Sequence, residues 1–146
     1  MKRFKIYLLN INLINKYMKI LEDNNIDYTL SFRDLATLLS NNKKINLTVF
    51  KNVKDFVGWY NKFINLSSFK KSSKDKISKE MDYYNPCYIP RNHLIEDALK
   101  NSVGGDMKEI NLIAEILKEP FTEKNEYEKY AMPSFSNERY VTYCGT

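Results

Sequence analysis

Apolar side chains recur every three or four residues along much of the chain, which is the spacing of one buried face of an amphipathic helix. In the first half this pattern predicts three helices: one from residue 4 to about 22, one that Thr29 caps, and one that Thr48 caps. The predicted buried positions are Leu9, Leu13, Tyr17, Ile20 and Leu21 in the first, Phe32, Leu35, Ala36 and Leu39 in the second, and Val49, Val53, Phe56, Tyr60, Phe63 and Ile64 in the third. Trp59 lies beside the third stripe, either as a contact with a neighbouring element or at the edge of the core.

Two further helices are predicted in the second half. Asn92 is a candidate N-cap for the first of them, and Gly104-Gly105 ends it. Asp106 opens a capping-box-like start for the other, which Pro120 ends. The predicted buried positions are Leu94, Ile95, Ala98, Leu99 and Val103 in the one and Ile110, Ile113, Ala114 and Leu117 in the other. With residues 121 onward interpreted as a loop and 139–143 as a short extended tail, the fold is expected to be mainly α-helical.

A Ser- and Lys-rich stretch is the best internal boundary. It divides the chain into a helical segment at 1–66, a connection at 67–81 and a second region at 82–146. Asn85-Pro86 and Pro90 then impose a short extended passage, because the residue before a proline is restricted to extended conformations. Lys70–Lys76 is interpreted as a solvated linker or exposed helix start, since no aromatic side chains interleave with its lysines as they would in a nucleic-acid site.

Composition narrows the classes of protein that fit. The 146 residues suffice for an ordinary core, and 43% apolar with 28% charged residues is a globular balance. The net charge of +5 is spread along the chain, so neither a nucleic-acid partner nor a phosphate-binding face is indicated. Polar residues interrupt the apolar N-terminal stretch, and no run approaches the ~20 apolar residues of a membrane helix. A soluble, cytoplasmic protein without a membrane partner is therefore expected.

The search for chemistry yields no catalytic, cofactor-binding or metal-binding residue. Gly104-Gly105 lies between two helices and is explained as a helix stop, and no phosphate-binding loop motif occurs. Cys87, His93 and Cys144 are too few for a structural zinc site, which usually needs four ligands in close pairs. His93 is interpreted as a surface or hydrogen-bonded residue and Cys87 as packed. Cys144, third from the end, is expected to be accessible, and taken alone it is interpreted as an inert thiol.

The order of residues in the second half is more specific. Asn85-Pro86-Cys87-Tyr88-Ile89-Pro90-Arg91-Asn92 resembles the Asn-Pro-x-Tyr-[Ile/Val]-x-Arg-Asn signature of the selenoprotein O (YdiU) family. The acidic-Ala-Leu pattern at 96–99 and the Cys144-Gly145-Thr146 ending are similar to features of that family, and Asp27-Tyr28-Thr29 with Phe32-Arg33 resembles a segment of it more loosely. The motif residues interpreted as structural are Asn85, Pro86, Tyr88, Arg91 and Asn92.

This resemblance implies the helical C-terminal part of a kinase-like (pseudokinase) fold. Members of the family are protein adenylyltransferases that use ATP and Mg²⁺ to transfer AMP to Ser, Thr or Tyr hydroxyls of proteins, and their nucleotide and metal residues lie upstream of the region matched. The chain is therefore expected to be a C-terminal fragment or split subunit that is inactive alone and binds no cofactor alone. A separately encoded kinase-like catalytic portion would be its partner, and protein substrates would be reached only through it.

The resemblance also implies a redox role for Cys144, in a disulfide with a cysteine of the catalytic portion. Pairing with Cys87 stays open at this point. Two other interpretations of the whole chain also stay open: a non-enzymatic helical interaction module, and a remnant without function.

Overall fold

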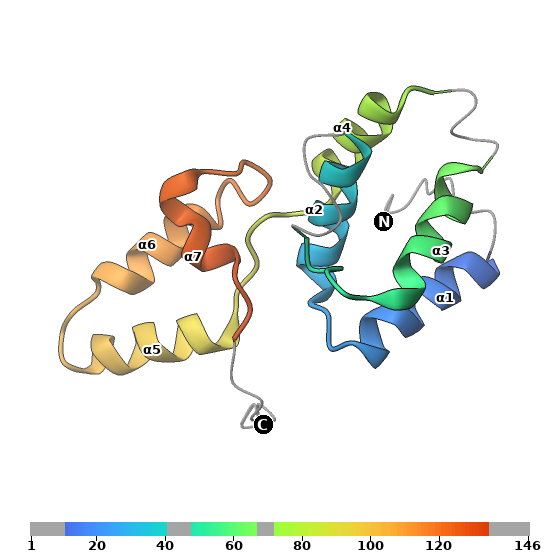
Figure 1. Ribbon diagram of the computed structural model, residues 1–146. Coiled ribbons are helices and arrows are strands. Elements are labelled where there is room, and N and C mark those ends of the chain that lie inside the picture. The colour runs from blue at the N-terminus through green and yellow to red at the C-terminus, as the bar shows by residue number, and fades with distance from the viewer. Residues whose placement is uncertain (1–10, 41–47, 67–71, 135–146) are drawn as a thin grey trace.

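The computed structural model describes residues 11–40, 48–66 and 72–134. These residues form helices joined by loops, and no strand occurs among them, so the prediction of a mainly helical chain is confirmed. The predicted extended tail at 139–143 lies outside the described residues. In chain order (Figure 1) the helices are α1 (Ile11–Asp23), α2 (Tyr28–Leu39), α3 (Lys54–Ile64), α4 (Lys74–Tyr84), α5 (Asn92–Val103), α6 (Lys108–Ile116), the short 3₁₀-helix η2 (Asn125–Tyr127) and α7 (Glu128–Ala131).

The helices form two hydrophobic cores that share no side chain. Helices α1 to α4 enclose the first core, in which α1 packs on α3 and α2 packs on α4. Helices α5 to α7 enclose the second core, to which Cys87 and Tyr88 also belong. Figure 1 shows the two groups of helices as separate bodies, joined by the extended segment that follows α4.

Aromatic side chains dominate the first core. Trp59 is buried, stacks on Tyr17 with ring centroids 4.4 Å apart, and donates its indole N–H to the carbonyl of Leu13 at 2.8 Å. Trp59 therefore joins α3 to α1, which decides between its two interpretations in favour of a contact with a neighbouring element. Phe50 and Phe56 stack nearly parallel with centroids 3.7 Å apart. The predicted stripes of α1 and α2 are buried at every described position, whereas Leu9 lies outside the described residues.

Two predicted helix starts are wrong. Asp27, not Thr29, caps α2, because its carboxylate accepts the Leu30 N–H at 2.8 Å. The Thr48 hydroxyl accepts the Phe50 N–H at 3.1 Å within a turn, and α3 begins only at Lys54. Asp27 and Thr29 are both good caps for α2, and the folded backbone selects the first; α3 has Val53 at its cap position, without a side-chain bond to the backbone.

The interval 67–81, expected as a connection, contains the first two turns of α4. Ser73 caps this helix by accepting the Lys76 N–H at 3.2 Å. Ile77 is buried in the first core, and the Ser78 hydroxyl donates to the Ala36 carbonyl of α2 at 2.7 Å. Helix α4 thus fastens onto α2, and the first core extends to the end of α4.

Helix α5 is covered less than its apolar pattern predicted. Only Ala98 of the predicted stripe is buried, whereas Leu99 is 47% and Val103 90% exposed. The second core provides only the nine-residue α6 and the short α7 as neighbours, so one side of α5 stays uncovered among the described residues. Asn92 is the first residue of α5 and not its cap; Arg91 occupies that position without a side-chain bond to the backbone.

The helix ends and starts predicted in the second half are found in part. Helix α5 ends at Gly104-Gly105 as expected, with Gly105 at a φ of 90° that other residues rarely adopt. Asp106 accepts the Lys108 N–H at 3.0 Å just before α6. Of the buried positions predicted in α6, Ala114 is exposed, and Ile116 is buried instead. The residues after Pro120 were expected to form a loop, but they include η2 and α7, which buries Tyr130.

Candidate functional site

The family-like segment 85–92 connects the two cores, and its first residues are fixed to opposite sides. The Asn85 backbone N–H and side-chain amide both donate to the Met81 carbonyl, at 2.9 and 2.7 Å, so Asn85 belongs to the end of α4. Its backbone is extended, as a residue before proline requires. The N–H groups of Cys87 and Tyr88 both donate to the Pro120 carbonyl of the second core, at 2.7 and 3.2 Å.

Tyr88 fastens the segment to the loop after α6. Its hydroxyl accepts the Lys124 N–H at 2.9 Å and donates to the Lys124 carbonyl at 3.1 Å. The ring is buried and lines a small cavity together with Arg91, Leu94 and Tyr130. This cavity measures about 10 Å³, which is room for a single water molecule.

A buried ion pair links the segment to the first core. Two nitrogens of the Arg91 guanidinium donate to the two carboxylate oxygens of Asp27, at 2.8 and 3.1 Å. The side chains are only 7% and 19% exposed. Such paired, charge-assisted bonds fix orientation as well as distance. Asp27 and Arg91 are 64 residues apart, and each lies in one of the two segments that resemble the family.

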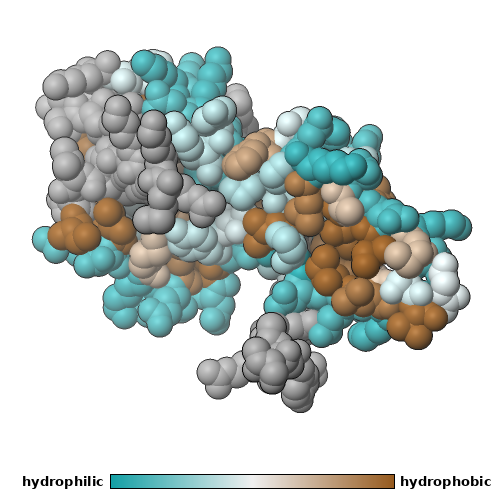
Figure 2. Space-filling model, turned by 180° about the vertical axis from the view of Figure 1, so that it is seen from behind, coloured by the Kyte–Doolittle hydropathy of each residue, from teal (hydrophilic) through white to brown (hydrophobic). Residues whose placement is uncertain are grey.

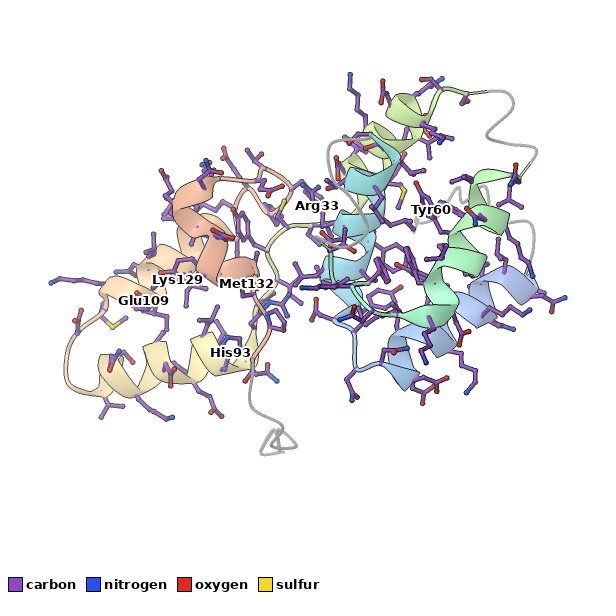
Figure 3. All side chains as sticks on the ribbon, viewed as in Figure 1. Arg33, Tyr60, His93, Glu109, Lys129 and Met132 are labelled. Atoms are coloured by element: carbon purple, nitrogen blue, oxygen red, sulfur yellow. The ribbon has the colours of Figure 1, made fainter. Side chains whose placement is uncertain are left out.

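Arg33 adds a second polar connection beside the first. From α2 its guanidinium pairs with Asp82 at the end of α4 at 2.9 Å, and with Glu123 of the loop after α6 at 3.0 Å (Figure 3). It also approaches the Asn85 carbonyl at 3.5 Å. Because Glu123 is 73% exposed, its pair with Arg33 contributes little on its own.

Burial and pairing shift several pKa values in this region. Burial alone would raise the pKa of Asp27, but the Arg91 guanidinium and nearby backbone N–H groups outweigh it and hold that pKa below its usual value. Burial raises the pKa of Asp82 despite the opposing charge of Arg33. Burial likewise raises the pKa of the Cys87 thiol, whose sulfur donates to the Phe121 carbonyl at 3.5 Å. Cys87 is therefore packed, as predicted, and protonated at neutral pH.

The lowered pKa of Asp27 leads to a pH prediction. Asp27 contributes stability that is fully present above its unfolded pKa of about 3.9 and is lost as the pH falls through its lower folded value. We expect the difference in free energy of unfolding between the unmodified protein and Asp27→Asn to shrink below about pH 4. Urea unfolding followed by Trp59 fluorescence across this range measures it. A difference that is constant with pH would contradict the prediction.

Most of the predicted motif residues lie in the segment that connects the two cores, which we call the motif junction. Asn85, Pro86, Tyr88 and Arg91 lie in it, whereas Asn92 is exposed on the first turn of α5. His93 is half-buried beside it, and Cys144 lies outside the described residues, so its redox role stays a prediction. Within the described ranges, no group of three or more His, Cys, Asp or Glu side chains is placed to hold a metal ion. No helix in these ranges is both long and apolar enough to cross a membrane.

Sequence reasoning missed the Arg33 ion pairs and two further polar clusters. One is the Asp27–Arg91 pair, for which the only signal was that both residues lie in family-like segments. The other joins α6 to α7: Glu109 accepts the Tyr130 hydroxyl at 2.8 Å and the Lys129 ammonium at 3.1 Å (Figure 3). These bonds lower the pKa of Glu109. They hold a four-residue helix that could not persist alone.

Comparison with known proteins identifies the family. The chain matches the family model described as Protein adenylyltransferase SelO over residues 3–118, which includes both family-like segments and ends before the Cys-Gly-Thr tail. It is similar to the Protein nucleotidyltransferase YdiU of Mycobacterium sp. (strain KMS), with 34% identity over 92% of this chain and 26% of the relative. The corresponding protein of Maridesulfovibrio salexigens is 32% identical over 92% of this chain and 28% of its own length. The corresponding protein of Clostridium perfringens (strain ATCC 13124) is 37% identical over 82% of this chain and 24% of its own length.

The matches cover most of this chain but only a small part of each relative. Nearly all of the sequence aligns, yet it spans only about a quarter of the length of these curated relatives. No solved structure matches. The family match extends over well more than half of the residues, first core and motif junction included. The chain belongs to the SelO family of protein adenylyltransferases.

Proposed function

We propose that this chain supplies the helical C-terminal portion of a SelO-type protein adenylyltransferase and works with a kinase-like catalytic portion. The observation that carries the proposal is the coverage: 92% of the chain aligns with relatives of which it spans only about a quarter. ATP and Mg²⁺ would bind to the catalytic portion, which would transfer AMP to protein hydroxyls. Alone, the chain would be inactive. Cys144 would form a disulfide with a cysteine of the catalytic portion.

A chimera tests whether the chain is equivalent to the corresponding part of a relative. In the Clostridium perfringens protein, the 120 aligned residues are replaced by this chain, and transfer of labelled AMP from ATP is measured. We expect the chimera to transfer AMP and the same protein with the region deleted to lose that activity. A chimera that folds but transfers no more AMP than the deletion would refute the proposal. Strong self-labelling of the isolated chain would refute the claim that it is inactive alone.

A second candidate is a non-enzymatic helical interaction module, and one observation favours it. Figure 2 shows apolar residues gathered on a face of the second core. The large apolar side chains that this core leaves exposed are Leu99, Val103, Met107, Phe121 and Met132. An exposed apolar face of this kind is typical of a surface that contacts another protein. An inactive chimera, together with a stable complex between the chain and some other protein, would favour this reading.

A further inference from the structure

The two cores are connected in a way that permits one to turn against the other. No side chain belongs to both hydrophobic cores, and the extensive helix contacts all lie within one core or the other. Among the described residues, the side-chain ion pairs between the cores are Asp27 with Arg91 and Arg33 with Glu123. Interfaces without a shared apolar core are those in which relative motion of domains is the default expectation.

Backbone hydrogen bonds locate the point of rotation. Asn85 is bonded to Met81, and so moves with α4. Cys87 and Tyr88 are bonded to Pro120, and so move with the second core. Between these two anchors the backbone torsions left free are those of Asn85 and Pro86, and the ring of Pro86 fixes its φ. A large change of orientation can therefore be produced by very few bond rotations, as in protein hinges.

The Asp27–Arg91 pair fixes the orientation that the hinge leaves free. Its two parallel bonds set both distance and angle between α2 and the start of α5. Because Arg91 is only 7% exposed, removing the Asp27 charge leaves a buried cation without its partner. Rotation at Asn85-Pro86 would relieve this by exposing Arg91 to water. The ion pair between Arg33 and Glu123 is exposed and too weak to prevent that rotation.

We propose that Asn85-Pro86 is a hinge between two helical bodies and that the Asp27–Arg91 ion pair is the latch that holds them in one relative orientation. This inference goes beyond the proposed function and does not depend on it, since the hinge belongs to the chain itself. It gives the family-like segment a division of roles: the hinge at its first two residues, the anchor at Cys87 and Tyr88, and the latch at Arg91.

Distance measurement between the two cores tests the proposal. Spin labels are placed at Lys62→Cys on α3 and Lys100→Cys on α5, both exposed, in a Cys144→Ser background; the remaining Cys87 is buried. The distribution of distances between the two labels is then recorded in the full chain by pulsed electron–electron double resonance. With the latch intact, we expect one narrow distribution.

Three variants separate the latch from general effects of charge. Asp27→Asn keeps a side-chain oxygen that can still cap α2 but removes the charge. Arg91→Gln removes the other partner, at a position whose side chain makes no cap bond. Glu115→Gln is the matched control, because it also removes one carboxylate from an ion pair, but that pair with Lys118 is exposed and joins two residues of the same helical body.

We expect both latch variants to broaden the distribution and shift its main peak, and Glu115→Gln to leave it unchanged. The buried Trp59 reports whether the first core stays folded in each variant. An unchanged narrow distribution in both latch variants would overturn the proposal. A broad distribution in the unmodified protein would overturn it too, since no orientation would then be held. Loss of the Trp59 signal in both latch variants would show that the pair holds the first core itself, which also contradicts the latch.

Discussion

Phe56→Ala is expected to lower the free energy of unfolding by about 3–5 kcal/mol, the usual cost of deleting a buried aromatic ring. Phe56 is 0% exposed, and it stacks on Phe50, Trp59 and Tyr60. Its removal would leave a cavity at the centre of the first core, where three other rings lose contacts at once. Urea unfolding followed by Trp59 fluorescence measures the loss directly, since the tryptophan belongs to the same core.

Phe121→Ala is the matched control for this prediction. The same ring is removed, but Phe121 is 48% exposed and lies outside both sets of core residues. We expect a change below about 1 kcal/mol, as is usual for surface substitutions. Equal losses for the two variants would show that the aromatic cluster of the first core is not what stabilises it.

Asp27→Ala is expected to lower the free energy of unfolding by roughly 2–4 kcal/mol, because one side chain performs two tasks. It caps α2 through the Leu30 N–H, and it neutralises the buried Arg91 guanidinium. Loss of a cap alone costs ~1 kcal/mol, and breaking a buried pair from one side costs ~3–5 kcal/mol. Opening at Asn85-Pro86 would return part of the second cost by hydrating Arg91, so the total should fall short of the sum.

Asp27→Asn distinguishes the two tasks in the same unfolding experiment. It retains the cap and loses the charge, so it should be more stable than Asp27→Ala by about 1 kcal/mol. If the two variants unfold at the same urea concentration, the cap contributes nothing and the ion pair carries the whole effect. If Asp27→Asn matches the unmodified protein, the ion pair contributes nothing.

The sequence predicted helices and buried faces best where apolar periodicity was long and regular. The stripes of α1 and α2 are buried as expected, and Gly104-Gly105 ends α5 where a helix stop was predicted. Helix starts were predicted less well. Asp27 and Thr29 are both good caps, and spacing does not show which of them the folded backbone selects.

What the sequence could not predict depended on the number and placement of neighbours. Leu99 and Val103 continue the apolar stripe of α5, but periodicity does not indicate whether another helix covers it. The Asp27–Arg91 pair joins residues 64 apart, and no rule of local spacing relates them. The interpretation of the family-like segment as structural stays a prediction, and the contact between Arg91 and Asp27 could not be inferred from the sequence. The kinase-like assignment and the redox role of Cys144 stay predictions.

The separation of the two cores has a consequence for synthesis on the ribosome. All described residues of the first core precede Asn85, and so they emerge before any residue of the second core. At the usual ~5–20 residues per second, the first core has seconds in which to fold before α6 and α7 are complete. Asp27 would already cap α2 before Arg91 has been synthesised. The contact that orients the two bodies thus forms only after every residue of the first core has been made, and a chain terminated after α4 still contains that whole core.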